Sequence, residues 1–507
     1  MHRVASCAAA LALAASLAAC TDESPEHQPG DQKRSTPPAE GRPGDGVVQL
    51  AEAQFQVGPA EIVMGPTTTA DSFINAVQVR GKVRAYVGRG DTYLLEGRDV
   101  TDLRPTGQQA LQRGGRGDFD HCGAWLNAVV RDQRDPGLLR AWYHAETDCS
   151  YADHQTRKSV AYAESRDGGV TFTKPGYPDN QVLRSSTDVV AGQRTGSGNT
   201  SIVRRGKYFF MYYQNVLPDF SIVTSVARAP IESGGAPGTW RNYTEDADGR
   251  GAWTSDALDG PAAALDVKVG ASSGSVHASS DEVMLLRQNG PRGGIVMQSS
   301  EDGIHFAQLR EPLVPYLDSQ IRDDWGVVDD KQIFGYVSAM ARDGAREWDD
   351  TFSLFHMYVF PGDALDDGRY LVRREVKVTE APADGPWSTV ALSSYVGAGG
   401  DRYATSAPEK PGSRFDGITA HLLSTNDTGR RGLFECRASN DDRYVSAACG
   451  TTPEEERLVG YAYTAAERGT VGLYRCETSA GDEFTSLDEA CEGGRTVAEL
   501  GYVYPPA

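Results

Sequence analysis

Apolar and polar residues alternate along this chain in short runs, and the apolar runs come in pairs. Between residues 46 and 385, each pair joins two segments rich in Val, Ile, Tyr or Phe across a turn with Gly, Asp or Ser, which is the sequence signal of a β-hairpin. Five such pairs open with DSFINAVQV, DFDHCGAWLNAVV, GSGNTSIV, ASSGSV and DDWGVV. They recur at roughly 60 to 75 residues, which suits four-stranded blades around a central axis. The pattern predicts an all-β fold in which residues 46–385 form a five-bladed β-propeller.

Residues 386–507 repeat at a shorter period. The segments GDRYATS, DDRYVS and GDEFTS place Tyr403, Tyr444 and Phe484 at spacings of 41 and 40 residues, and GLFEC and LVGYAY are echoed by GLYRC and ELGYVY. Because no single repeat can bury its own apolar face, three of them are expected to close a small threefold barrel of the β-trefoil-like kind. Repeats of this kind often bind sugars, and a structural cap or a protein-docking domain is the alternative.

Size and charge narrow the class of protein. A chain of 507 residues is expected to form at least two domains, and its 56 Gly and 26 Pro favour strands and turns over helices. The formal net charge of −20 disfavours nucleic acid as the main partner, because such binding requires a dense Lys/Arg patch. A neutral or basic ligand is easier to accommodate.

The N-terminal segment predicts export. Residues 1–20 have a basic start, a short apolar run and the sequence LAAC, which resembles a bacterial lipobox and implies cleavage before Cys20 and lipidation of its sulfur. Residues 21–45 are polar and rich in Pro, so they are expected to be a disordered tether. The expected location is therefore extracellular, with the protein lipid-anchored to the cell membrane as a lipoprotein, and plain secretion is the alternative.

Six cysteines remain once Cys7 and Cys20 are set aside. An even number in an oxidising compartment indicates disulfides, and pairing of nearest neighbours gives Cys122–Cys149, Cys436–Cys449 and Cys476–Cys491. The chain contains no CxxC or HExxH spacing, so we expect no metal and no cofactor. It also lacks a phosphate-binding loop and a GxSxG elbow.

Two short turns carry a family resemblance. SRDGGVTF, from Ser165 to Phe172, resembles the Asp-box of sialidases and other propeller glycosidases. SSEDGIHF, from Ser299 to Phe306, is similar to a shorter form found in five-bladed furanosidases and fructosidases. Asp167 and Asp302 are expected to accept backbone amides in a tight turn, in which Gly supplies positive φ and the aromatic ring packs beneath the blade. These turns bear on the fold and not on catalysis.

A second resemblance points to chemistry. The succession of HCGAWLNAV, WYHAE, SVAYAESRDGG, GSGNTSIV and SGSVHASSDEV resembles a group of secreted bacterial, glycosyl-hydrolase-like five-bladed propellers. It differs from that group at Asn199, where the group tends to have an acid, and at residues 276–279, VHAS instead of VHWN. The resemblance implies a glycoside hydrolase acting on a poly- or oligosaccharide.

Glycoside hydrolysis requires two carboxyl groups beside the scissile bond. We expect Glu146 to be the acid and Asp120 its partner, because the two segments are neighbours across one hairpin that a Cys122–Cys149 bridge would clamp. Asp71, at the start of the first blade, is the leading substitute. The residues expected to contact substrate or tune the carboxyl groups are His121, His144, Trp125, Asn199, His277 and Trp325.

Each residue also has a structural interpretation. Asp71 and Asp120 fit turn caps, Trp125 fits a core position, and a strand-edge histidine is usually satisfied by the backbone. The sequence therefore favours a glycoside hydrolase, with a non-catalytic, lectin-like glycan-binding lipoprotein as the alternative.

Overall fold

A computed structural model describes residues 48–184, 188–267, 273–288, 294–308, 311–315, 332–381, 387–437, 442–449 and 457–506. These residues belong to one compact unit. The expected signal segment, the tether, Cys20 and Trp325 lie outside the described residues.

The described residues form an all-β structure, as predicted. Its helical segments are single 3-10 turns, namely η1 (Leu50–Glu52), η2 (Tyr151–Asp153), η3 (Ile231–Ser233) and η6 (Cys491–Gly493). No helix among the described residues is long and apolar enough to cross a membrane.

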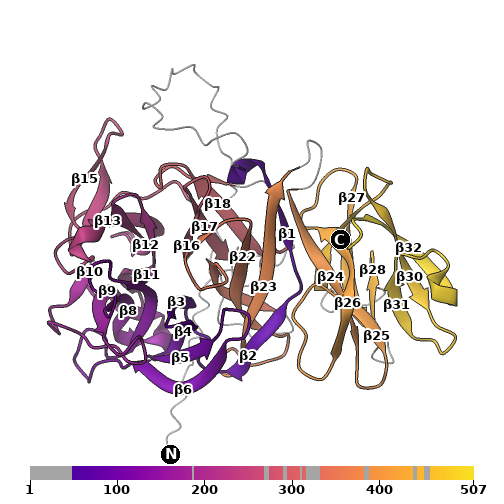
Figure 1. Cartoon of the computed structure of the whole chain (residues 1–507), viewed down its shortest axis with the longest axis horizontal. Coiled ribbons are helices and arrows are strands. Elements are labelled where there is room, and N and C mark those ends of the chain that lie inside the picture. The colour runs from indigo at the N-terminus through magenta and orange to yellow at the C-terminus, as the bar shows by residue number, and fades with distance from the viewer. Residues whose placement is uncertain are drawn as a thin grey trace, which may run out of the picture. The chain divides into compact units, whose positions relative to one another are not determined.

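Four successive antiparallel meanders follow one another along the chain (Figure 1). Meander 1 contains β3 (Asn75–Val79), β4 (Lys82–Arg89), β5 (Asp91–Gly97) and β6 (Arg104–Leu111). Meander 2 contains β7 (Gly123–Arg131), β8 (Leu139–Ser150), β9 (Gln155–Ser165) and β10 (Gln181–Arg184). Meander 3 contains β11 (Arg194–Arg205), β12 (Tyr208–Val216), β13 (Ile222–Pro230), β14 (Arg241–Glu245) and β15 (Gly251–Asp256). Meander 4 contains β16 (Ser273–His277), β17 (Glu282–Gln288), β18 (Ile295–Ser300) and β19 (Ala307–Gln308), with the short β21 (Glu347–Trp348) parallel to β16.

The fifth group of strands is completed from the N-terminal side. β20 (Ile333–Met340), β22 (Thr351–Val359) and β23 (Arg369–Glu380) form an antiparallel meander, and both β1 (Ala53–Val57) and β2 (Glu61–Thr67) pair with β23. We call this group meander 5. The first and last parts of residues 48–381 are thereby joined in one sheet.

The first strands of the five meanders neighbour one another in a closed order. β3 contacts β7, β7 contacts β11, β11 contacts β16, β16 contacts β20, and β20 contacts β3. Most ladders run outward within each meander, and the start of β11 also pairs in parallel with β9, so meanders 2 and 3 share one sheet. Acidic residues far apart in sequence can therefore meet near these strands.

Equivalent tyrosine hydrogen bonds connect neighbouring meanders. Tyr86 of meander 1 donates a hydrogen bond from its hydroxyl to the Gly169 carbonyl over 2.8 Å, and Tyr212 of meander 3 donates to the Gly303 carbonyl over 2.9 Å. Both acceptors lie in the turns that the sequence singled out. There Asp167 accepts the Val170 amide over 2.9 Å, as the pattern predicts.

The shorter turn is built in the same way. Asp302 accepts the Ile304 and His305 amides over 2.8 Å, Gly303 has φ +78°, and Phe306 meets Tyr212 edge to face. In both turns the aspartate is bonded to backbone amides, so the turns position neighbouring sheets.

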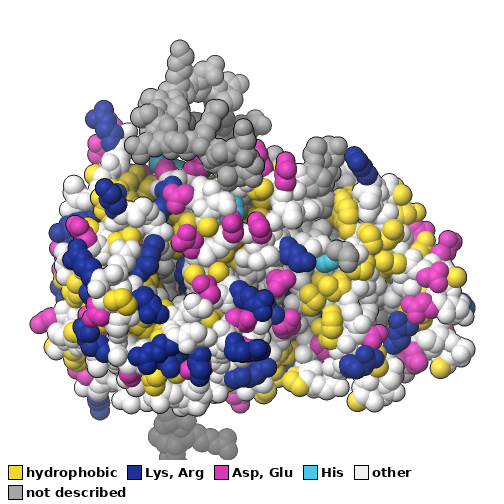
Figure 2. Space-filling view, viewed as in Figure 1, with side chains coloured by type: hydrophobic (Ala, Val, Ile, Leu, Met, Phe, Trp, Pro, Cys, Tyr) yellow, Lys and Arg dark blue, Asp and Glu magenta, His cyan; other side chains and the backbone are white. Residues whose placement is uncertain are grey.

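Residues 387–506 add three similar groups of strands, which we call the C-terminal module. The first group is β24 (Ser388–Val396), β25 (Arg402–Thr405) and β26 (Arg414–Leu423). The second is β27 (Arg430–Arg437), β28 (Arg443–Ser446) and β29 (Arg457–Tyr463), and the third is β30 (Val471–Glu477), β31 (Glu483–Ser486) and β32 (Arg495–Val503). On the face shown in Figure 2, hydrophobic side chains gather over this module.

The three groups of the module are related in a cyclic way. Leu423 pairs with Tyr461, Tyr463 pairs with Tyr502, and Tyr504 pairs with His421, so each long strand meets the next around a closed triangle. Each repeat predicted from the sequence is therefore in contact with both of the others.

Each predicted aromatic ring is covered by an arginine from another group. The guanidinium of Arg443 lies 4.0 Å from the Tyr403 ring centre, Arg475 lies 3.7 Å from Tyr444, and Arg402 lies 4.4 Å from Phe484. Such cation–π contacts contribute about 0.5–2 kcal/mol each. The three aromatic positions that recur in the sequence therefore make equivalent contacts in the structure.

The three predicted disulfides are confirmed. Cys122 is bonded to Cys149, Cys436 to Cys449, and Cys476 to Cys491. The first ties the start of β7 to the end of β8, and the other two each close a hairpin of the C-terminal module.

Candidate functional site

Glu146 lies on β8 next to the beginning of β7. Its register partner is Gly123, and the ring of Trp125 occupies the space where a side chain on Gly123 would lie, because an added Cβ would be 1.9 Å from that ring. His144 and Glu146 are two residues apart on one strand, so their side chains share a face. Glu146 is buried, with 8 % of its surface exposed.

The hydrogen bonds of His144 settle its tautomer. The Asn199 backbone amide donates to His144 Nδ1 over 3.2 Å, so in the neutral ring the proton is on Nε2. Nε2 lies 3.0 Å from Glu146 Oε1 and donates to it. This approach requires Gly198, since a Cβ there would be 2.3 Å from His144 Nδ1.

The surroundings of Glu146 favour its ionised form. Burial opposes ionisation, but the hydrogen bond from His144, the nearby charge of Lys158 and the Tyr151 hydroxyl, which donates to Oε2 over 2.7 Å, lower the pKa of Glu146 to about 2. Lys158 is the register partner of Glu146 on β9 and donates to Gln214 over 2.6 Å. Its burial lowers the pKa of Lys158 to about 8.

Asp71 precedes β3 and has different neighbours. Tyr336, on β20, donates to Asp71 Oδ1 over 2.9 Å, and Arg369, at the start of β23, forms an ion pair with the same oxygen. Burial raises the pKa of Asp71, while Arg369 and Tyr336 act in the opposite direction. The pKa of Asp71 is thus displaced upward and that of Glu146 downward.

The two carboxyl groups lie close enough to act on the same side chains. The charges of both Asp71 and Glu146 raise the pKa of Tyr336, and both also raise the pKa of Tyr151. Since Asp71 comes from meander 1, Glu146 from meander 2 and Tyr336 from meander 5, the site is assembled from three sheets. We call Asp71, His144, Glu146, Tyr151 and Tyr336 the carboxylate cluster.

Tyr151 offers a test of how the cluster controls ionisation. Replacing Tyr151→Phe removes a hydrogen bond that favours the charged carboxylate, so the pKa of Glu146 rises from about 2 toward its usual value of 4.5. Because the ionised form is lost as pH falls through the pKa of Glu146, a higher pKa is expected to move the acidic limb of any activity profile to higher pH. A pH–rate profile checks this, and a uniform fall in rate at every pH would contradict it.

The structure places Asp120, the expected partner of Glu146, on the other face of β8. Asp120 is fully buried and accepts hydrogen bonds from the Gly114 amide (3.1 Å), Tyr143 (3.2 Å), Tyr177 (3.0 Å) and Lys174 (2.6 Å). Tyr143 precedes His144 on β8, so its side chain points to the opposite face of the strand from His144 and Glu146. The sheet therefore separates the two acids, and Asp71 is instead the acid that acts on the same tyrosines as Glu146.

His121 lies with Asp120 and not with the carboxylate cluster. Its Nδ1 is 2.9 Å from the Asp118 carbonyl and 3.0 Å from the Thr147 hydroxyl. Thr147 follows Glu146, so its side chain points to the opposite face of β8. The Cys122–Cys149 disulfide stands beside this group and clamps the two strand ends.

Trp125 and Asn199 do reach the cluster. The Trp125 ring is buried against the His144 ring, with centres 5.3 Å apart, and its indole Nε1 has no partner among the described residues. Asn199 holds His144 through its backbone and donates its side-chain amide to Gln214 over 3.2 Å. Trp125 therefore packs against the cluster, as a buried core position would.

His277 lies elsewhere. It ends β16, where its ring contacts Trp348 and its Nδ1 is 2.7 Å from the Ser280 hydroxyl, and burial lowers its pKa. Ser280 in turn donates to Glu282. These contacts satisfy His277 within meander 4, apart from the carboxylate cluster.

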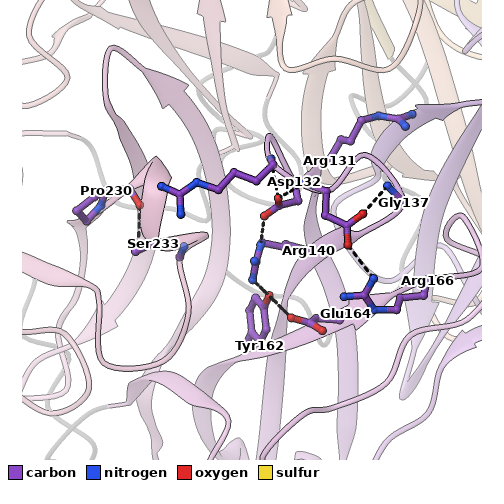
Figure 3. A network of polar contacts seen from close by, with 12 residues as sticks. Arg131, Asp132, Gly137, Arg140, Tyr162, Glu164, Arg166, Pro230 and Ser233 are labelled. Atoms are coloured by element: carbon purple, nitrogen blue, oxygen red, sulfur yellow. Dashed lines mark hydrogen bonds and ion pairs between the residues drawn. The ribbon is translucent and has the colours of Figure 1, made fainter.

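A second acidic group on meander 2 has a structural role. Figure 3 shows Asp132 and Glu164 on either side of Arg140, which bonds Asp132 over 2.5 Å, while Tyr162 donates to Glu164 over 2.8 Å. Arg140 and Glu164 are partners at the far end of the β8–β9 ladder from Glu146. This ion-paired group provides a matched control for substitutions at Glu146.

Within the described residues, one cluster has the spacing of a metal site, and it is formed by His121, Cys122 and Cys149. Both sulfurs are joined in a disulfide, so they cannot act as thiolate ligands.

Several residues in and around the cluster were not predicted from sequence. Tyr336 and Arg369 lie far from Asp71 along the chain and belong to no recognisable motif. Tyr151 follows the WYHAE segment closely, and its position beside Cys149 was the one available signal. The position of Lys158 beside Glu146 follows from the register of β8 and β9.

Comparisons with known proteins give weak similarity. No protein-family model and no curated protein matches the chain. A family 117 glycoside hydrolase from Zobellia galactanivorans is 12% identical, with 65% of this chain and 91% of that chain covered at a TM-score of 0.41. An α-L-arabinofuranosidase from Lactobacillus brevis is 12% identical, with 63% and 93% covered at 0.40. A GH43_1 enzyme from Xanthomonas citri, complexed with xylotriose, is 14% identical, with 64% and 91% covered at 0.37. None of these matches assigns a role to a residue of this chain.

Proposed function

We propose that the protein is an extracellular glycoside hydrolase, built on a five-bladed propeller and tethered to the membrane by a lipid on Cys20. The observation that carries the proposal is the carboxylate cluster, in which two acids from different sheets share neighbours and have pKa values displaced in opposite directions. A pair of titratable groups whose environments shift their pKa values in opposite directions is the usual basis for assigning the catalytic acid and the catalytic base.

The closed order of β3, β7, β11, β16 and β20 supports the propeller. Each of these strands is the first of its meander, as expected if they surround an axis, and β1 and β2 complete the fifth sheet. The cyclic pairing of β26, β29 and β32 supports a β-trefoil-like module, for which we propose glycan binding.

The environments suggest the roles of the two acids. Glu146 is held ionised, so it acts as the base that activates water or as the nucleophile that attacks the anomeric carbon. Asp71, whose pKa burial raises, donates a proton to the leaving oxygen as the glycosidic bond breaks. This reverses the role of proton donor expected for Glu146 from sequence, and replaces Asp120 by Asp71.

The test is a screen of the purified protein against nitrophenyl glycosides and against cell-wall and plant polysaccharides. Release of nitrophenol or new reducing ends is expected from at least one substrate class, and should be absent in an Asp71→Asn, Glu146→Gln double variant of unchanged circular dichroism. Release that persists in the double variant would locate the activity outside the carboxylate cluster.

A second candidate function is a non-catalytic, glycan-binding propeller. The ion pair between Arg369 and Asp71 favours it, because an ion-paired carboxylate is a poor proton donor. Retention of the protein on an immobilised glycan, without hydrolysis of any member of the panel, would support this candidate over the enzyme.

A further inference from the structure

A cavity lies toward the ends of β7, β11 and β16, and no residue of the carboxylate cluster lines it. It has a volume of about 390 Å³ and is lined by β3, by the later residues of β7, β11 and β16, and by the segment after β20. Glu146, in contrast, pairs with Gly123 at the beginning of β7, and Asp71 precedes β3. The cavity is therefore separate from the proposed active site, and its capacity to bind a ligand is independent of the proposed function.

Three arginines line this cavity, namely Arg131, Arg204 and Arg346. No ion pair joins any of them to a carboxylate among the described residues, although the chain as a whole carries a net charge of −20. Their contacts are made instead to neutral acceptors. Such groups retain the capacity to bind an anion, because no carboxylate is ion-paired with them, although Glu347 and Asp132 act on Arg204 from a distance.

Arg346 is the most deeply placed of the three. Its guanidinium donates to the Ser273 hydroxyl, to the Gly274 carbonyl over 3.3 Å and to the Ile74 carbonyl over 3.2 Å, so it links β16 to the residue before β3. Burial lowers the pKa of Arg346 to about 10, and no neighbouring acid offsets this. Arg346 remains charged at neutral pH.

Among the described residues, Arg204 makes one side-chain hydrogen bond and lies over the Phe209 ring. Nη2 donates to the Arg131 carbonyl over 2.6 Å, while Nε has no partner among the described residues. Arg131 itself donates to the Pro136 and Gln78 carbonyls over 3.0 and 2.6 Å. A guanidinium carries five N–H donors in a planar fork that matches a carboxylate.

The rest of the lining is mainly small and apolar, with Ala76, Ala128, Val276 and Ala345 among its members. A pocket of 300–1,000 Å³ that combines apolar walls with a few fixed polar groups is typical of small-molecule sites. The volume fits a molecule of about monosaccharide size, and the apolar walls fit its carbon skeleton. The exposed Asp343 and Glu347 at the cavity disfavour highly charged polyanions.

We propose that this cavity binds a small organic acid of monosaccharide size, with Arg204 and Arg346 recognising its carboxylate. The carboxylate cluster is not a competing site for such a ligand, because Asp71 and Glu146 repel an anion there. The proposal thus predicts a site that distinguishes an acid from its neutral analogue.

The experiment is isothermal titration of the full chain with D-glucuronate, and separately with D-glucose, which has the same ring without the carboxylate. Binding of glucuronate and no binding of glucose at the same concentrations is expected. Absence of glucuronate binding, or equal binding of the two sugars, would overturn the proposal.

Variants locate the site. Arg204→Met is expected to weaken glucuronate binding by about tenfold or more, the effect of losing a charge-assisted hydrogen bond, and Arg204→Lys to weaken it less. Arg495→Met removes one positive charge from an exposed ion pair in the C-terminal module and serves as the matched control, with unchanged affinity expected. Glu146→Gln should also leave the affinity unchanged.

The same variants distinguish a misfolded protein and binding at another site from loss of the proposed site. Thermal melting verifies that Arg204→Met is folded. If it is not, the affinity of the Arg204→Lys variant for glucuronate tests the role of Arg204. Equal affinity in wild type and a folded Arg204→Met, or a loss in Glu146→Gln instead, would place the bound acid elsewhere and refute the assignment. Failure of hydrolysis in the glycan screen leaves this result unaffected.

Discussion

Replacing Glu146→Gln is expected to lower the turnover of a responsive glycoside by about 10³-fold, within the range that acid/base groups contribute to catalysis. The amide keeps the size of the side chain and can still accept from Tyr151, but it can neither take up a proton nor attack carbon. The melting temperature is expected to fall, because buried Lys158 loses the negative charge beside it, so turnover is compared well below the melting temperature of the variant. Measurement of kcat and KM on the substrate found in the screen checks this.

Glu164→Gln is the matched control. Glu164 is also a partly buried carboxylate of meander 2, with Tyr162 and Arg140 as partners, and its position at the far end of the ladder predicts a turnover close to that of the wild type. If both variants lost activity alike, the effect would be a general loss of structure in meander 2. If Glu146→Gln kept full turnover, Glu146 would have no catalytic role.

Removing the Cys122–Cys149 disulfide by Cys122→Ser with Cys149→Ser is expected to reduce the free energy of unfolding by about 3–4 kcal/mol, because the bond closes a loop of 27 residues in sequence separation. It should also lower turnover, since the bond holds the strand ends that carry Gly123 and Glu146. Urea denaturation and kcat are measured together.

The control is the pair Cys436→Ser and Cys449→Ser, which opens a loop of 13 residues in the C-terminal module. A similar loss of stability with unchanged turnover is expected there. Turnover that fell equally in both double variants would show that activity follows global stability and not the position of the β7 and β8 ends.

The strands and disulfides of this chain follow from local rules. Alternating apolar residues around Gly and Asp turns identify the hairpins, and the nearest cysteines lie across those hairpins, so pairing by proximity succeeds. The aromatic positions Tyr403, Tyr444 and Phe484 were likewise readable, because the repeats place equivalent residues in equivalent environments. Local pattern is sufficient wherever the contact itself is local.

The site required information that sequence lacks. Choosing between Asp120 and Asp71 as the partner of Glu146 depends on which face of β8 each acid meets, and a one-residue difference on a strand reverses that face. Tyr336 and Arg369 approach Asp71 only after meander 5 has returned beside meander 1. No spacing along the chain encodes that return.

The position of β1 has a consequence for how the molecule forms and comes apart. Residues Ala53–Val57 pair with Val376–Glu380 on one side, and Phe55–Val57 pair in parallel with Ser388–Val390 on the other (Figure 1). More than three hundred residues must therefore be synthesised before this strand finds either neighbour, and such long-range closure slows folding. In the folded protein, β1 is hydrogen-bonded to both meander 5 and the C-terminal module. The two parts are therefore expected to unfold in one cooperative transition and not separately.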